Sequence, residues 1–141
     1  MAGNFRFTAR RAVFLVLVLY WSAMFVGTHR TSTPESSPMM NDKALHFGAY
    51  CGLSFLFCWT FLPSRGWKGP LGVMAVIATY GCADEWTQLF VPTRSADVAD
   101  WLADIVGGLV GLAIYLVIAS WTRERAVRRS STPLLIRKDA A

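Results

Sequence analysis

The stretch AVFLVLVLYWSAMFVGT, residues 12–28, is the main indication of the fold class of this chain. It is apolar almost without a break, whereas a strand of a membrane β-barrel alternates between apolar and polar residues over about ten positions. As a helix, with a rise of about 1.5 Å per residue, it is nearly long enough to cross a hydrocarbon layer of about 30 Å. Residues 12–28 therefore predict a membrane-spanning helix.

Three further apolar blocks follow at residues 44–62, 71–90 and 98–121, separated by breaks that contain proline or glycine. The composition agrees, because 54% of the residues are hydrophobic and only 16% are charged, against about a quarter in soluble domains. We expect an all-α membrane protein, a bundle of four transmembrane helices over residues 12–121. A basic segment at 1–11 precedes the bundle, and a basic, disordered tail at 122–141 follows it.

The basic residues predict the orientation. Most of the 14 Lys and Arg residues lie before the first block, between the second and third blocks, or after the fourth. By the positive-inside rule, both termini and the middle loop are cytoplasmic in a multi-pass protein of the cell membrane. A cleaved signal peptide is the alternative interpretation of the first block. The net charge of +5 fits contact with membrane lipids and predicts no nucleic-acid binding, since no aromatic platform or known binding module accompanies it.

Most of the nine acidic residues fall on the other side, at the outer ends of the predicted helices. An ionised side chain that faces lipid at the bilayer centre costs about 2.5–3.5 kcal/mol, so these carboxylates should face the interior of the bundle or the interface. Asp97, Asp100 and Asp104 share one stripe of the fourth helix, and Asp42 and His46 share one of the second, which continues to Tyr50. The acidic residues are therefore expected to converge.

The convergence predicts a ligand-binding site at the outer face, with Glu85, Gln88, Arg94 and Asp100 at its centre. The full predicted set is Asp42, Lys43, His46, Asp84, Glu85, Gln88, Arg94, Asp97, Asp100 and Asp104. His46 and Glu85 are also the candidates for acid/base catalysis. The stripe of the fourth helix continues into Gly107, Gly108 and Gly111, which predict a close helix contact, within the bundle or between copies.

Simpler roles remain for parts of this set. Asp42 and Asp97 are also placed to cap helices, and internal ion pairs with Lys43 or Arg94 are the strongest structural alternative. One nearby histidine is a weak basis for zinc, whereas a site for a divalent cation such as Mg²⁺ or Ca²⁺ fits the oxygen ligands. No other cofactor is expected. The three cysteines have no Cys-x-x-Cys spacing and are interpreted as buried free thiols.

Three motifs in order carry a resemblance: Asp42-Lys43-x-x-His46-Phe47, then Glu85-x-x-Gln88-x-Phe90-x-Pro92-x-Arg94, then Asp97 with Asp100-x-x-x-Asp104-x-x-Gly107. Over residues 10–120 the chain resembles the VanZ-like family of small membrane proteins, whose namesake is associated with resistance to the glycopeptide teicoplanin. The family usually has asparagine at the position of Asp104 and commonly glycine at that of Thr93. The resemblance implies a role in the cell envelope and does not imply a reaction.

Two classes of function follow. The first is a binding protein whose ligand is a lipid headgroup, a cell-wall precursor or a glycopeptide. The second is a membrane-embedded hydrolase or transferase that acts on a lipid-linked envelope substrate. No nucleophile elbow, phosphate loop or two-histidine metal motif supports the second class. No inverted repeat or helix broken at mid-depth favours a transporter.

Overall fold

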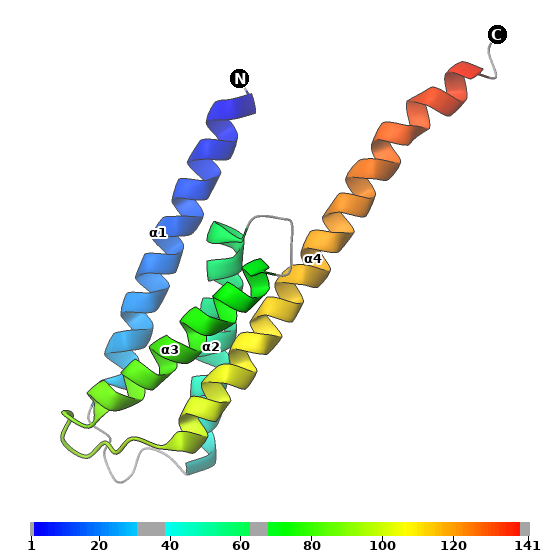
Figure 1. Cartoon of the computed structure of the whole chain (residues 1–141). Helices are drawn as coiled ribbons and strands as arrows, with labels where there is room; N and C mark the ends of the chain where they lie inside the picture. Colours follow the sequence, from blue (N-terminus) through cyan, green and yellow to red (C-terminus); the bar gives the residue numbers. More distant parts are fainter. Residues whose placement is uncertain (1, 31–38, 63–67, 139–141) are drawn as a thin grey trace.

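Four helices make up the fold. The structure is a computed structural model that describes residues 2–30, 39–62 and 68–138. Helix α1 covers Ala2–Thr28, α2 Met39–Phe61, α3 Lys68–Gln88 and α4 Val98–Lys138 (Figure 1). Within those described residues no strand is present, so the all-α prediction is confirmed.

Three of the helices are long and apolar enough to cross a membrane. The qualifying stretches are Arg11–Thr28 in α1, Asp42–Phe61 in α2 and Val98–Arg128 in α4. Helix α3 is not among them. Its last two turns contain Asp84, Glu85 and Gln88, which lower its mean hydropathy. The expected helices are all present, and three of the four expected spans meet the length and hydropathy that a span needs.

Helix α4 is longer than expected. The sequence predicts disorder from residue 122, whereas α4 continues to Lys138. Its continuation begins with Thr122, Arg123, Glu124, Arg125 and Ala126, and arginine, glutamate and alanine all favour helix in water. The residues that follow the apolar block therefore extend the same helix.

The centre of the bundle is the contact between α2 and α4, which glycines bring close together. A Cβ atom added at Gly107 would meet the carbonyl oxygen of Phe47, and one added at Gly111 would meet that of Cys51. Gly108 faces α3 instead, where an added Cβ would lie 2.7 Å from Cγ2 of Ile77. The predicted close contact through the glycine stripe is thus found within the bundle, against both α2 and α3.

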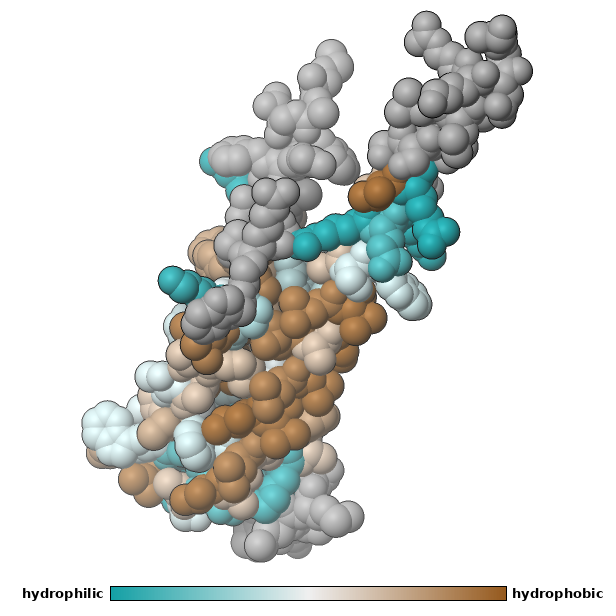
Figure 2. Space-filling view, turned by 45° about the vertical axis from the view of Figure 1, so that its right-hand side comes forward, coloured by the Kyte–Doolittle hydropathy of each residue, from teal (hydrophilic) through white to brown (hydrophobic). Residues whose placement is uncertain are grey.

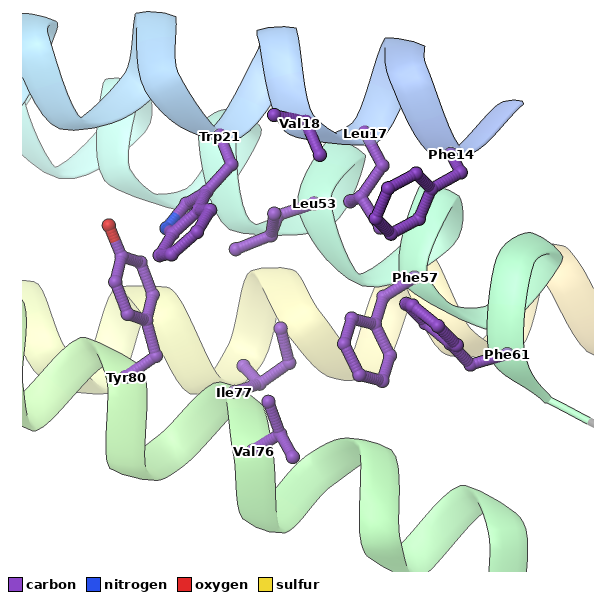
Figure 3. A pocket seen from close by; sticks show the side chains of 10 residues that line it. All are labelled: Phe14, Leu17, Val18, Trp21, Leu53, Phe57, Phe61, Val76, Ile77 and Tyr80. Atoms are coloured by element: carbon purple, nitrogen blue, oxygen red, sulfur yellow. The ribbon is translucent and has the colours of Figure 1, made fainter. Parts of the chain in front are cut away.

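Helix α1 packs less closely than the others. Leu17 and Met24 are buried against the bundle, and the Tyr20 hydroxyl donates a 2.9 Å hydrogen bond to the Ala49 carbonyl of α2. Between α1, α2 and α3 lies a groove of about 310 Å³ (Figure 3). The lining residues are Phe14, Leu17, Val18, Trp21, Leu53, Phe57, Phe61, Val76, Ile77 and Tyr80. The groove is lined almost entirely by apolar side chains and is separate from the polar residues described below.

The outer surface of the bundle is also apolar. Figure 2 shows a broad hydrophobic surface along the middle of the molecule, with hydrophilic side chains gathered beyond it. Large apolar side chains such as Leu19 and Leu71 are both 61% exposed. Such a belt is unfavourable in water and fits a hydrocarbon environment.

The cysteines are only partly as expected. All three are free thiols, and Cys58 is buried, whereas Cys51 is half-buried and Cys82 is exposed. In an apolar bundle a small thiol on the outer surface of a helix is compatible with lipid, so exposure of Cys82 breaks no packing rule.

Most of the basic residues and most of the acidic residues lie at opposite ends of the apolar belt. Helices α1 and α3 begin, and α2 and α4 end, toward one end of the bundle, and α1 and α3 finish at the other end, where α2 and α4 begin (Figure 1). A short turn joins α3 to α4 at this second end, and within it Thr93 has a φ of 71°. That is the left-handed region, which is strained for a β-branched residue and easily adopted by glycine.

Candidate functional site

All four helices contribute polar side chains to the end where α2 and α4 begin. We call this group the polar cluster. Its members are Thr28, His29, Asp42, Lys43, His46, Asp84, Glu85, Gln88, Arg94, Asp97, Asp100 and Asp104. His46, Asp84, Glu85, Gln88, Asp100 and Asp104 are buried. The sequence-predicted residues are therefore gathered at one end of the molecule.

The buried centre of the polar cluster is a histidine between two carboxylates from different helices. Nδ1 of His46 lies 2.9 Å from Oδ1 of Asp104 and 3.8 Å from Oε1 of Glu85. Asp104 has no exposed surface, and His46 is 3% exposed. Gly81 of α3 makes room for the aspartate, because an added Cβ there would lie 3.0 Å from Oδ2 of Asp104. Helices α2, α3 and α4 thus meet at these three side chains.

Glu85 and Asp97 join the end of α3 to the start of α4. Oε2 of Glu85 accepts a 2.8 Å hydrogen bond from the backbone N–H of Asp97. Oδ1 of Asp97 accepts a 2.8 Å bond from the N–H of Ala99, so Asp97 caps α4, which is one of the roles that its position in the sequence allows. The hydrogen bond from Lys43 is the main cause that lowers the pKa of Asp97 below its ordinary value, and the N–H of Ala99 adds to it.

Lys43 connects α2 to the first turn of α4. Its Nζ lies 2.7 Å from Oδ2 of Asp97 and 2.8 Å from Oδ1 of Asp100. Both distances are those of charge-assisted hydrogen bonds. Lys43 thus forms the internal ion pairs that were the structural alternative to a ligand-binding role, and its partners are the two aspartates at the start of α4.

Arg94 lies at the edge of the polar cluster and not at its centre. Its guanidinium donates to Oδ2 of Asp42 over 3.3 Å and to the carbonyl oxygen of Arg30 over 3.3 Å. Charge-assisted N–H···O bonds are commonly about 2.7–2.9 Å, so both contacts are long. Asp42 is thus placed toward Arg94, from the first turn of α2.

Gln88 also lies away from the expected centre. Its Nε2 donates a 3.2 Å bond to Oδ2 of Asp84, and Oδ1 of the same aspartate accepts a 3.2 Å bond from the hydroxyl of Thr28. Nε2 of His29 lies 2.9 Å from the hydroxyl of Thr87. Asp84 and Thr87 therefore join α3 to the end of α1, whereas Glu85 faces His46.

Thr28 and His29 are members that the sequence motifs do not include. They end the first apolar block, and a polar pair at that position resembles an ordinary helix end. Their depth along the bundle is the feature by which they could have been predicted. They lie at the same outer end as Asp84 and Glu85 once α1 is placed antiparallel to α2 (Figure 1).

Several buried polar atoms of the bundle have no hydrogen-bond partner. Among the described residues they are Oε1 of Glu85, Oδ2 of Asp104 and the hydroxyls of Tyr50, Ser54 and Tyr80. Buried polar groups are satisfied in the great majority of proteins, by protein atoms, water or a bound ion. Glu85 and Asp104 thus each have one buried oxygen that is available to a further group.

The charges of the polar cluster are unbalanced. Four carboxylates are buried, those of Asp84, Glu85, Asp100 and Asp104, whereas His46 is the sole buried basic side chain in the parts of the chain that the structure describes. Lys43 forms an ion pair with Asp100 and shares its charge with Asp97. Asp84, Glu85 and Asp104 form no ion pair with lysine or arginine within the described residues.

A pocket of about 220 Å³ opens beside the centre, between α1, α2 and the α3–α4 turn. One side of it is polar, with Thr28, Asp42, His46 and Arg94. The other side is formed by Met24, Gly27, Leu45 and Ala49. The pocket therefore offers a charged corner and an apolar wall to the same ligand.

The comparisons with known proteins agree with the motifs. The sequence profile of the VanZ/LLP1 family matches residues 5–119. The chain is also similar to an uncharacterized protein of Schizosaccharomyces pombe, with 28% identity over 103 residues, which are 73% of this chain and 61% of the yeast protein. It thus spans less than two thirds of that relative's length. No solved structure matches. The profile match includes α2 and α3 completely, α1 from residue 5, α4 as far as residue 119, and every motif residue of the polar cluster, and the chain therefore belongs to the VanZ/LLP1 family.

Proposed function

We propose that this chain is an integral membrane protein that binds the polar headgroup of a lipid-linked ligand at the outer face of the membrane. The observation that carries the proposal is the pocket between α1 and α2, whose polar corner and apolar wall match the two halves of an amphipathic molecule. The wall continues toward the exposed apolar surface of the bundle, where lipid tails would lie.

The orientation is part of the proposal. Helix α3 packs against both α4 and α2, and its exposed Val76 and Leu71 belong to the apolar belt, so we place it in the membrane with the other three. Arg11, Lys68 and Arg123 lie at the opposite end from the polar cluster. The positive-inside rule then puts both termini in the cytoplasm and the pocket outside.

The chemistry of the corner defines the headgroup. Arg94 presents a planar fork suited to two oxygens of a phosphate, and its long contacts to Asp42 and to the Arg30 carbonyl are ones that an oxyanion can replace. Asp42 and Thr28 are suited to hydroxyl groups on the same headgroup. A lipid-linked cell-wall precursor and a phospholipid both carry this combination, and a glycopeptide carries the hydroxyls without the phosphate.

Gly27 provides the test. It lines the pocket, and an added Cβ would meet nothing within 4 Å, so Gly27→Leu fills the pocket with little strain. Gly72→Leu is the matched control, because an added Cβ there also meets nothing within 4 Å and Gly72 lies on α3, outside the pocket. We expect co-purifying or added lipid-linked ligand, counted by native mass spectrometry, to be lost in Gly27→Leu and kept in Gly72→Leu. Equal retention in both variants contradicts the proposal.

A second candidate is an enzyme that uses the same pocket. His46 lines the pocket, and its Nδ1 contacts the buried Asp104, an arrangement that orients an imidazole as a general base. Its substrate would be the same lipid-linked class, with hydrolysis or group transfer as the reaction. Release of product from lipid-linked precursors by the wild type, lost in His46→Gln with ligand binding retained, distinguishes this candidate from simple binding.

Teicoplanin resistance is the phenotype associated with the family's namesake, and for this chain it is a proposal. Expression of the wild type and of Gly27→Leu in a susceptible host, followed by measurement of teicoplanin sensitivity, tests it. Protection by the wild type alone would link the phenotype to the pocket.

A further inference from the structure

The buried centre of the polar cluster has the composition of a cation site. It contains one imidazole and two carboxylates from three helices, and one ligand atom of each of His46, Glu85 and Asp104 lies within 4.8 Å of the others. These atoms are buried beside the pocket and are not part of the surface acidity that is common in proteins. We propose that His46, Glu85 and Asp104 bind one divalent cation of the Mn²⁺ or Zn²⁺ type.

The distances fit such an ion. Ligands at about 2.1 Å from a metal are about 3.0 Å apart at right angles and about 3.4 Å apart in a tetrahedron. Nδ1 of His46 is 2.9 Å from Oδ1 of Asp104 and 3.8 Å from Oε1 of Glu85. A cation among these atoms takes the place of the hydrogen bond between Nδ1 and Oδ1, and Oε1 of Glu85 moves closer to Nδ1 than its present 3.8 Å.

One carboxylate oxygen at this centre is buried and accepts no hydrogen bond. Oε1 of Glu85 is buried, points toward His46 and accepts no hydrogen bond, although Glu85 is only 6% exposed. Its other oxygen is already used by the N–H of Asp97, so the side chain is held in place with one oxygen free. Such a fixed, unsatisfied oxygen is costly unless it binds a proton or a cation.

Charge balance supports the same conclusion. Glu85 and Asp104 bring two negative charges, and within the described residues no lysine or arginine forms an ion pair with either. One divalent cation balances both and leaves His46 neutral, which is the form in which imidazole binds a metal.

A second group, Asp42, His46 and Asp100, also has suitable spacing. It is a poorer site, because Arg94 contacts Asp42 and Lys43 contacts Asp100. Those carboxylates already have protein cations as partners.

The ligand set selects the metal. Imidazole suits zinc and other transition metals, and carboxylates suit manganese, magnesium and calcium, so one nitrogen and two carboxylates favour Mn²⁺ or Zn²⁺ over Mg²⁺ and Ca²⁺. The remaining positions on the ion are left for water or for a ligand oxygen from the pocket, which His46 also lines.

The test uses the full chain in nanodiscs, stripped with a chelator and titrated separately with Mn²⁺, Zn²⁺, Mg²⁺ and Ca²⁺. We expect wild type to bind one Mn²⁺ or Zn²⁺, and Asp104→Asn and Glu85→Gln to bind it at least tenfold more weakly. Asp84→Asn is the matched control. It removes a buried carboxylate next to Glu85 whose partners are Thr28 and Gln88, so it should bind the metal as wild type does. Pulsed electron paramagnetic resonance of bound Mn²⁺ should show a histidine nitrogen that His46→Gln removes.

Folding and binding are separated by the melting temperature of the stripped proteins. The side-chain amide introduced by Asp104→Asn can still accept a hydrogen bond from His46, so this variant should melt no lower than wild type without metal and should lack the stabilisation that metal gives. Absence of metal binding by wild type, or equal binding by Asp104→Asn, overturns the proposal. The cation site is independent of the proposed lipid function, since Gly27→Leu should lose the lipid and keep the metal.

Discussion

Replacing Gly107 with alanine tests whether the α2–α4 contact holds the bundle together. The added Cβ would lie 3.0 Å from the carbonyl carbon of Phe47 and 3.1 Å from its Cα, and it would also meet the carbonyl oxygen. Relaxed carbon contacts are about 3.5–4.0 Å, and the carbonyl oxygen is nearer still than the two carbons, so α4 and α2 must separate by about 1 Å or more. These neighbours are backbone atoms, which have no rotamer by which to move aside.

The expected cost follows from this geometry. Overpacking of a close contact costs about 1–3 kcal/mol, and the better helix propensity of alanine over glycine returns about 0.5–1 kcal/mol. Gly107→Ala should therefore lower the free energy of unfolding by up to about 2.5 kcal/mol. Gly72→Ala is the control, because its Cβ meets nothing within 4 Å, and it should be neutral or raise stability by up to about 1 kcal/mol.

Reversible unfolding in mixed micelles, followed by circular dichroism, measures both variants against wild type. The two substitutions are chemically identical and differ only in what surrounds the new methyl group. The reasoning is refuted if Gly107→Ala is as stable as Gly72→Ala, because Gly107 would then face lipid and not α2.

Two other predictions concern the polar end. Lys43 lowers the pKa of Asp97 from its ordinary 3.8, so the stability that this pair provides is present above that pH and is lost as the pH falls further. In Lys43→Met the free energy of unfolding should fall less steeply with decreasing pH over this range. An unchanged dependence on pH in the acid range would count against the prediction. In a cysteine-free background, Thr93→Cys should react with an impermeant thiol reagent from outside intact cells and Arg123→Cys only after permeabilisation, and the reverse pattern would invert the proposed orientation.

Most members of the polar cluster, but not Thr28 and His29, were predictable from the sequence, whereas their arrangement was not. Carboxylates within apolar helices must avoid lipid, so the helical spacing of Asp97, Asp100 and Asp104 suffices to place them inside. The motifs nevertheless predict Gln88 and Arg94 at the centre. In the structure Gln88 contacts Asp84 on the side of α1, and Arg94 contacts Asp42 at the edge.

The all-α class, the apolar blocks and the glycine stripe can all be read from the order of the residues, because each of these depends on neighbours along one helix. The position of His46 between Glu85 and Asp104 cannot, since a helix fixes the angle between its own residues but not its rotation or depth relative to another helix. Rotation and depth are set by contacts between helices, above all by Gly107 and Gly111 against the backbone of α2. Packing of α1 against the same bundle brings its end beside Asp84 and so adds Thr28 to the polar cluster.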